Sequence, residues 1–203
     1  MGIVGARSVE KFLVVGDAWG QLVTWYAPDH ATVLEIGCGC GRAARVLVNN
    51  RWINRYIGFD VIRRSIEWCR CHIAPYWHGT AEFHWFDLYS GEYNPLGGIH
   101  ARQFTFPCKD GAADIVFAAS VFTHLLEPDA VRYLEETRRV LSTRGTALLS
   151  IHIEFPAGER FHGTEARIDM DPKYFVELAT RAGLRHHEDI DFAGQQTFAF
   201  KKS

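Results

Sequence analysis

The sequence has no long hydrophobic run. Its longest apolar stretches, such as residues 115–119, are far shorter than the roughly 20 residues that a membrane helix needs. Residues 1–15 carry scattered charges and lack the continuous apolar segment and small-residue cleavage site of a secretory signal. We therefore expect a cytoplasmic protein without a membrane partner.

The sequence also lacks an excess of charge of one sign. Its 203 residues include 22 Lys and Arg against 24 Asp and Glu, a net charge of -2, and the basic residues are spread along the chain. Proteins that bind nucleic acid neutralise phosphates with clustered basic residues. The charge pattern therefore argues against nucleic acid as a partner.

The sequence has no cysteine spacing that predicts a metal site. Four of the five cysteines form two C-x-C pairs, Cys38 with Cys40 and Cys69 with Cys71. The second pair falls in a predicted helix, where residues two apart point to opposite sides, and the first lies in a glycine turn. We expect that the chain binds no metal, and that its thiols are reduced and mostly buried.

What the sequence has is an alternation of short apolar segments with longer amphipathic ones. This pattern predicts an α/β fold, a Rossmann-like doubly wound, mostly parallel seven-stranded sheet with an antiparallel C-terminal strand. No linker or repeat divides the chain, so we expect one domain over residues 1–203, with residues 1–30 as an N-terminal helical cap. The expected strands are 32–36, 56–59, 83–86, 113–118, 146–153, 185–191 and 197–200, and the expected helices are 9–26, 42–49, 63–73, 129–141 and 172–182.

Two features of the connections add detail. Asp171 and Pro172 are placed to begin the last helix and Gly183 to end it, and Ala193 with Gly194 predicts a turn between the closing strands. Residues 87–107 form a loop longer than is usual inside a domain. Such loops are more often functional than idle, so we expect this loop beside the site.

An apolar strand followed by three alternating glycines is the strongest local signal. Residues 33–42 read V-L-E-I-G-C-G-C-G-R, with glycine at Gly37, Gly39 and Gly41 and Cys38 between the first two. Glycines let the backbone turn sharply and approach a ligand, whose polar groups meet amides at the start of the next helix. Two alternatives remain, a tight turn without a ligand and the related G-x-G-x-x-G of nicotinamide-binding domains.

Acidic residues end the next two predicted strands. Asp60 follows the strand after the glycine turn, where a carboxylate can accept hydrogen bonds from both hydroxyls of a ribose, and Val61 is its neighbour. Asp87 ends the following strand and is placed to accept from an adenine amino group, with Leu88 packed on the ring. Alternatively, an acid at the end of a strand serves only as a cap for the backbone that follows.

In combination these features resemble the class I S-adenosylmethionine-dependent methyltransferases, over residues 31–201. Residues 106–120 resemble the fourth-strand motif of that family and residues 133–141 its following helix. The resemblance implies S-adenosylmethionine as cofactor, and the residues that it assigns to cofactor binding are Glu35, Gly37, Cys38, Gly39, Gly41, Asp60, Val61, Asp87, Leu88 and Ser120. It also implies that Glu35 and the glycine turn surround the methionine part and the ribose.

The chain departs from the family pattern in three places. Glu35 stands where Asp is common, and S-T-R-G at residues 142–145 replaces the usual Pro-Gly-Gly. Only residues 154–170 separate the fifth strand from the last helix, a segment that is often longer where the acceptor is elaborate. The acceptor therefore stays open, and we expect a small metabolite, a sugar or a natural-product intermediate.

Histidines after the fourth and fifth strands are the candidate catalytic groups. Methyl transfer is a direct displacement that mainly needs alignment, and an acceptor hydroxyl also needs a general base. His124 and His152 lie near the carboxyl ends of strands, where ligands of parallel sheets bind. Alternatively, His124 only supports the start of a helix and His152 is a packed core imidazole.

Aromatic residues and the long loop complete the expected site. An aromatic wall of Trp19, Trp85, Tyr89 and Tyr93 is one interpretation, and core filling is the other. Residues 93–98 are a hypothetical flap over the cofactor. The competing functions are a nicotinamide-dependent oxidoreductase and a cofactor-binding subunit or sensor without catalysis. We expect a monomer or a homodimer.

Overall fold

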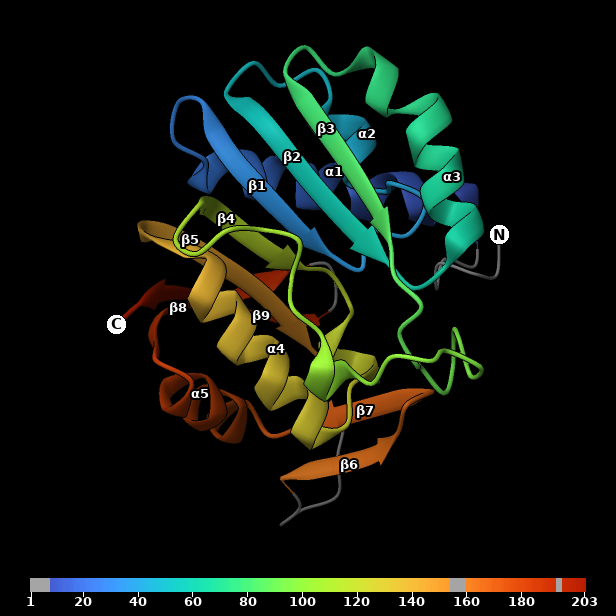
Figure 1. Cartoon of the computed structure of the whole chain (residues 1–203). Coiled ribbons are helices and arrows are strands. Elements are labelled where there is room, and N and C mark those ends of the chain that lie inside the picture. The colour runs from blue at the N-terminus through green and yellow to red at the C-terminus, as the bar shows by residue number, and fades with distance from the viewer. Residues whose placement is uncertain (1–7, 154–159, 193–194) are drawn as a thin grey trace.

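Seven strands form one sheet, in the order β3-β2-β1-β4-β5-β9-β8, in a computed structural model that describes residues 8–153, 160–192 and 195–203 (Figure 1). The strands are β1 (Ala31–Ile36), β2 (Ile53–Asp60), β3 (Thr80–Trp85), β4 (Ala113–Ala118), β5 (Leu141–Ile151), β8 (Leu184–Phe192) and β9 (Gln195–Lys202). β9 pairs antiparallel with both β5 and β8, and the other pairs are parallel. The predicted fold class is confirmed.

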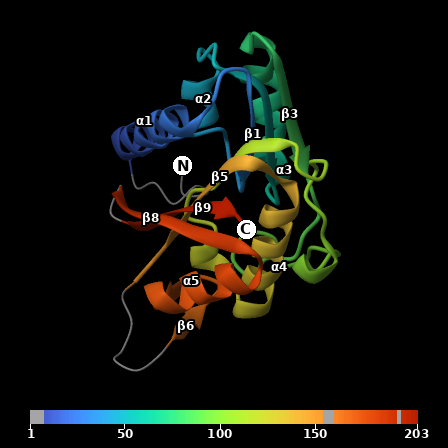
Figure 2. The same cartoon turned by 90° about the vertical axis from the view of Figure 1, so that its left-hand side faces the viewer.

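Helices cover both faces of the sheet, as Figures 1 and 2 show. The helices α1 (Val9–Tyr26), α2 (Ala44–Leu47) and α3 (Arg63–His72) bury Trp19, Leu47 and Ile66 in one core layer. On the other face α4 (Glu127–Val140) and α5 (Pro172–Arg181) bury Leu134 and Phe175. The described residues also form the short 3-10 helices η2 (Ala74–Tyr76), η3 (Ala101–Gln103) and η4 (Phe122–His124), and a hairpin of β6 (Phe161–Thr164) with β7 (Arg167–Met170).

The main differences from the predicted elements have local causes. α2 has four residues, where the prediction placed a helix over 42–49, because positive φ angles at Gly37, Gly39 and Gly41 delay the helix until Ala44. β5 begins at Leu141 and not at residue 146, since its first residue already pairs with Ala113 across a bulge. The hairpin of β6 and β7 lies in a segment for which no strand was predicted.

Other boundaries agree closely with the sequence. α1 has the predicted bounds, and the Asp171 side chain caps α5 by accepting a 2.8 Å hydrogen bond from Tyr174 N. Gly183 has φ +83° after that helix, as predicted. β2 begins three residues before its predicted start, β3 runs over Thr80–Trp85 instead of 83–86, and α4 begins and ends slightly earlier than predicted. The predicted turn at residues 193–194 lies outside the described residues.

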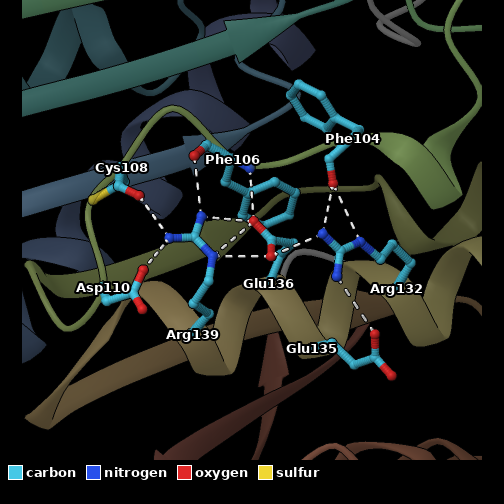
Figure 3. A network of polar contacts seen from close by, with 8 residues as sticks. All are labelled: Phe104, Phe106, Cys108, Asp110, Arg132, Glu135, Glu136 and Arg139. Carbon is cyan, nitrogen blue, oxygen red and sulfur yellow. Dashed lines mark hydrogen bonds and ion pairs between the residues drawn. The ribbon is translucent and has the colours of Figure 1, made fainter.

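Hydrogen bonds hold both halves of the long loop between β3 and β4. In the first half, Asn94 Nδ2 donates to Asp87 Oδ1 at 3.1 Å and to Leu88 O at 2.9 Å. In the second half, α4 holds the backbone of residues 104–108 through Glu136 and two arginines (Figure 3). The loop is therefore anchored to the fold on either side of residues 95–103.

The cysteines of the chain are all free, and Cys69 is buried whereas Cys71 is exposed, which confirms their predicted opposite directions. Within residues 8–153, 160–192 and 195–203, no group of three or more His, Cys, Asp or Glu side chains is placed to hold a metal ion. Over the same residues, no helix combines the length and the apolar character needed to span a membrane.

Candidate functional site

A cavity of about 430 Å³ opens where β1, β2, β4 and β5 end, a volume within the usual range of roughly 300–1,000 Å³ for small-molecule sites. The carboxyl edge of a parallel sheet is the usual place for a ligand. Its walls come from α1, the glycine turn, the long loop, η4, the β6–β7 hairpin and the start of β9. The lining includes Lys11, Trp19, Gly37, Cys38, Gly39, Arg42, Asp60, Val61, Tyr89, Tyr93, Ser120, His124, Asp129, Tyr133, His152, Glu165 and Gln195.

The three glycines of the turn have different surroundings. Gly37 and Gly39 line the cavity with Cys38 between them, and a β-carbon at Gly37 would lie 2.5 Å from Val121 Cγ2. Gly41 is not part of the lining, and a β-carbon there would lie 2.2 Å from Ile73 Cδ1. Gly37 thus leaves room for Val121, and Gly41 lets α3 pack against the turn. The place of Gly37 and Gly39 in the lining fits an adenosyl cofactor.

Asp60 lies at the end of β2 and faces the cavity beside Val61. Its Oδ2 accepts a hydrogen bond from Gly39 N at 2.7 Å, and its Oδ1 accepts from Ile62 N at 2.8 Å. Burial raises the pKa of this carboxyl group, and the amide donors lower it in part. Each carboxylate oxygen keeps a further lone pair, so the group can still accept from the two hydroxyls of a ribose.

Glu35 lies behind the cavity and does not line it. Its carboxylate accepts a hydrogen bond from the Tyr56 hydroxyl, and its side chain is buried. Burial raises its pKa to about 8, although the hydrogen bond from Tyr56 and the positive charge of Arg42 act in the opposite direction. Glu35 therefore supports β1 and β2 from the α1 side of the sheet.

Asp87 and Leu88 are also outside the lining. The two Asp87 oxygens accept from Asn94 Nδ2 and from Gly98 N, both at 3.1 Å, and Leu88 is buried in the core. In this arrangement Asp87 orders residues 94–98 and does not face the cavity.

Ser120, directly after β4, joins three strands around the cavity. It has φ +64°, an angle that non-glycine residues seldom adopt. Ser150 Oγ accepts from Ser120 N at 2.9 Å, and Gln195 Oε1 accepts from the hydroxyls of both Ser120 and Ser150 at 2.9 Å. These bonds leave the Gln195 amide as a donor, and its Nε2 lies 3.4 Å from His152 Nε2.

His124 is fixed by two polar contacts. Its Nδ1 lies 2.8 Å from the backbone oxygen of Glu165, in the turn of the β6–β7 hairpin. Since a carbonyl only accepts, Nδ1 carries the proton in the neutral ring and Nε2 keeps its lone pair. The Tyr93 hydroxyl lies 3.2 Å from Nε2, and the two rings meet edge to face at 5.0 Å.

The cavity brings together most of the residues predicted for the site. Of the proposed aromatic wall, Trp19, Tyr89 and Tyr93 line it, whereas Trp85 is bonded to Val61 O outside it. Sequence reasoning missed several lining residues, namely Lys11, Arg42, Asp129, Tyr133, Glu165 and Gln195. Only Arg42 had a signal, its place directly after the glycine turn.

The reversed strand of the sheet, the glycine turn and the acid at the end of β2 define an α/β protein that binds an adenosyl cofactor. A 1,6-didemethyltoxoflavin-N1-methyltransferase from Burkholderia thailandensis has this fold, with a TM-score of 0.71, 15% identity, and coverage of 100% of this chain and 84% of that chain. So does a TehB-like S-adenosylmethionine-dependent methyltransferase from Corynebacterium glutamicum, with a TM-score of 0.66, 20% identity and coverage of 94% and 89%. The cyclase SpnF also shares it, with a TM-score of 0.65, 19% identity and coverage of 87% and 60%.

Residues 34–149, more than half of the chain, match the family model described as a methyltransferase domain. The chain therefore belongs to this family, and the class I S-adenosylmethionine-dependent methyltransferase predicted from the sequence is confirmed. Its cofactor is S-adenosylmethionine. The nicotinamide-dependent oxidoreductase, which shared the strand and the glycine turn, is thereby excluded.

Proposed function

We propose that this enzyme methylates a small-molecule acceptor on oxygen or nitrogen, with His124 as the general base. The proposal depends on the contacts of the two ring nitrogens of His124. Its Nδ1 is held by Glu165 O, and Nε2 keeps a lone pair on the cavity side. A general base needs this combination of a fixed ring and a lone pair that faces the place of the acceptor.

The cavity offers separate places for the cofactor and the acceptor. We assign the methionine part and the ribose to Gly37, Cys38 and Gly39, the ribose hydroxyls to Asp60, and adjoining contacts to Val61 and Ser120. A second set of residues supports this place from outside the cavity. That set comprises Glu35 and Gly41 behind the turn, and Asp87 and Leu88, which shape the adenine end by holding the long loop.

Tyr93 marks the position of the acceptor atom. Its hydroxyl lies 3.2 Å from His124 Nε2, where an acceptor hydroxyl would donate its proton. When bound, S-adenosylmethionine supplies a methyl group whose carbon-sulfur bond breaks as the new bond to the acceptor forms, and sulfur keeps the electron pair of the broken bond. His124 takes the acceptor proton, and the residues of the cavity align the acceptor with the methyl group. Tyr93 belongs to the proposed flap over residues 93–98, so acceptor binding would displace it.

The second histidine is placed for orientation. His152 Nε2 lies against the amide of Gln195, which also receives the hydroxyls of Ser120 and Ser150. The amide at His152 Nε2 is held in place by the hydroxyls of Ser120 and Ser150, whereas His124 Nε2 faces a single tyrosine hydroxyl, so His124 is the more accessible base. We therefore assign to His152 the positioning of Gln195 and Ser120, and the proton transfer to His124.

A cofactor-binding subunit or sensor without catalysis would need no acceptor pocket. The cavity continues past the glycine turn to His124, Asp129 and Tyr133, which favours an enzyme. The mild negative charge of the chain favours a small acceptor over nucleic acid. We also propose that residues 1–203 form one domain with an N-terminal helical cap. The location that we propose is the cytoplasm, and the proposed oligomeric state is a monomer or a homodimer.

The experiment compares His124→Gln with His152→Gln on a panel of phenols, catechols and amines, with S-adenosylhomocysteine release as the readout. We expect His124→Gln to lower kcat roughly 100-fold or more while leaving the affinity for S-adenosylhomocysteine unchanged. The pH dependence of the wild-type rate should be lost in His124→Gln, because glutamine does not accept a proton.

His152→Gln provides the comparison within the same cavity, and we expect a smaller loss of kcat with the pH profile retained. Equal losses in both variants, or a pH profile that His124→Gln leaves unchanged, would remove His124 as the base. Binding of S-adenosylhomocysteine without methyl transfer to any acceptor of the panel would favour the subunit or sensor.

A further inference from the structure

Two carboxylates line the cavity beside His124, and the proposed chemistry uses neither of them. Asp129 is in the first turn of α4, and Glu165 is in the β6–β7 turn, where its backbone oxygen holds the His124 ring. Within the part of the chain that the structure describes, neither carboxylate has a hydrogen-bond or ion-pair partner. By contrast Glu127, two residues before Asp129, accepts from the Tyr174 hydroxyl.

The charges of Asp129 and Glu165 act on each other. Burial raises the pKa of Asp129, Arg102 and His100 lower it, and Glu165 raises it further. Arg102 and His100 are exposed and do not line the cavity. Two like charges at one end of a cavity repel each other, and a cation bound between them removes that cost.

Tyr133 adds a buried hydroxyl next to Asp129. It lies four residues after Asp129 on α4, and residues four apart on a helix are neighbours. Tyr133 is only 5% exposed, its ring packs edge to face on Phe106 at 5.2 Å, and it lines the cavity. No described residue pairs with its hydroxyl. A buried hydroxyl without a partner is costly, so this group also indicates that a polar ligand binds here.

An ammonium group fits these three side chains. It donates three hydrogen bonds, and two carboxylates with a phenol oxygen accept them. Hydrogen bonds between charged partners are roughly twice as strong as bonds between neutral groups. An acceptor with a carboxylate or a phosphate in this place would instead meet two negative charges. An amine held by two carboxylates also keeps its proton, and so it has no lone pair with which to attack a methyl group.

We propose that the acceptor is a phenol or an alcohol that also carries an aliphatic amine, and that Asp129, Glu165 and the Tyr133 hydroxyl bind this amine in its protonated form. The inference rests on the proposed function, because the hydroxyl of the same molecule is the group whose proton His124 takes. The hydroxyl oxygen forms the bond to the methyl carbon, its proton goes to His124 Nε2, and the electron pair of the broken bond stays on the cofactor sulfur. The amine nitrogen is not methylated.

Calorimetry on the full chain saturated with S-adenosylhomocysteine tests this assignment with two matched pairs of compounds. Tyramine is paired with para-ethylphenol, and meta-tyramine with meta-ethylphenol, so that the members of a pair differ only in the ammonium group. We expect the wild type to bind the amines roughly 10-fold or more tighter than the neutral phenols. Asp129→Asn and Glu165→Gln should each weaken binding of the amines roughly 10-fold, the loss of one charge-assisted hydrogen bond, and change binding of the neutral phenols less than about twofold. Tyr133→Phe, which removes only the hydroxyl, should weaken binding of the amines about threefold.

The matched control is Glu135→Gln, which removes a half-exposed acid of α4 outside the cavity and should leave all affinities unchanged. Binding of S-adenosylhomocysteine alone should also be the same in every variant. Weaker binding of it by Asp129→Asn or Glu165→Gln overturns the proposal and assigns the carboxylates to the ammonium group of the cofactor. A wild type without a preference for the amines, or a preference that both variants keep, overturns it as well.

Phenethylamine, which keeps the ammonium group and lacks the hydroxyl, tests the methylated atom. We expect it to bind like tyramine and to release no S-adenosylhomocysteine when it is incubated with S-adenosylmethionine and the enzyme. Turnover of phenethylamine would overturn the assignment of oxygen as the methylated atom. The preference for amines decides this inference and turnover of a hydroxyl acceptor decides the proposed function, so the two failures are distinct.

Discussion

At the scale of single residues, Gly41 and Gly111 adopt similar backbone angles in different surroundings. Their φ angles are +77° and +64°, in the left-handed region that costs a residue with a side chain about 1–2 kcal/mol. A β-carbon at Gly41 would lie 2.2 Å from Ile73 Cδ1, whereas one at Gly111 meets nothing within 4 Å. Substitutions at Gly41 and Gly111 therefore distinguish the cost of the backbone angle from the cost of a steric clash.

We expect Gly111→Ala to lower the free energy of unfolding by about 1–2 kcal/mol, the cost of the backbone angle alone. Gly41→Ala should lose about 1–3 kcal/mol more, since the buried Ile73 must move and α3 must shift with it. Urea unfolding of both variants measures the difference. Equal losses would mean that Ile73 gives way without cost and that only φ matters at Gly41.

Site residues that stand in a motif were predictable, and those brought in by tertiary contacts were not. Gly37, Gly39 and Asp60 follow strands in a fixed order, so their position at the sheet edge could be derived from the sequence. Gln195 and Glu165 enter the cavity from β9 and from the β6–β7 turn. No spacing relates them to the glycine turn, because the pairing of distant strands decides where they lie.

At the scale of elements, α4 and the loop before β4 are joined by one buried carboxylate. Glu136 Oε2 accepts from Phe106 N at 2.8 Å and from Arg139 Nη2 at 2.6 Å, while Oε1 lies 3.0 Å from Arg132 Nη2 (Figure 3). The two arginines also donate to the carbonyls of residues 104, 106 and 108. Glu136 thus holds both arginines in place for the loop.

We expect Glu136→Ala to lower the free energy of unfolding by about 3 kcal/mol, near the lower end for a broken buried ion pair because both arginines keep some contact with water. Glu135→Ala is the matched control, because the Glu135 side chain is half exposed and its ion pair with Arg132 Nη1 is long, at 3.6 Å. We expect Glu135→Ala to lower the free energy of unfolding by less than about 1 kcal/mol. Urea unfolding gives both values, and hydrogen exchange should quicken at Phe106 N in Glu136→Ala alone. Similar losses in the two variants would contradict a role for the buried pair.

The predicted elements were most accurate where periodicity and capping agreed. α1 and α5 have long amphipathic patterns and clear ends, and the structure has them near the predicted bounds. α2 was predicted too long because its apolar pattern continues into residues whose backbone the glycine turn controls. The β6–β7 hairpin was missed because residues 161–170 are mostly polar, and only the pairing of the two strands stabilises them as strands.

At the scale of the whole molecule, the buried Glu35 makes folding depend on pH. Its pKa is about 8 in the folded protein and near 4.5 when exposed. Between these values the folded chain keeps a proton that the unfolded chain releases, so the free energy of unfolding falls as pH rises. The stabilisation of protonated Glu35 is complete below about pH 4.5 and is lost as the pH approaches 8.

Glu35→Gln should remove this dependence, because an uncharged amide still accepts from the Tyr56 hydroxyl. We expect the variant to gain stability relative to wild type by several kcal/mol between pH 5 and pH 8. Unfolding free energies at half-unit pH steps measure the difference, with the exposed Glu10→Gln as control. A constant difference across the range would mean that Glu35 is ionised throughout.

The cavity has walls from both ends of the chain, with Trp19 on α1 and Gln195 at the first position of β9. Gln195 Oε1 accepts from the hydroxyls of Ser120 and Ser150, so β9 supplies the acceptor that ties the ends of β4 and β5 together at the cavity. Contacts between segments about 175 residues apart thus complete one wall of the site, and a shift of β9 would change that wall even if the glycine turn stayed in place.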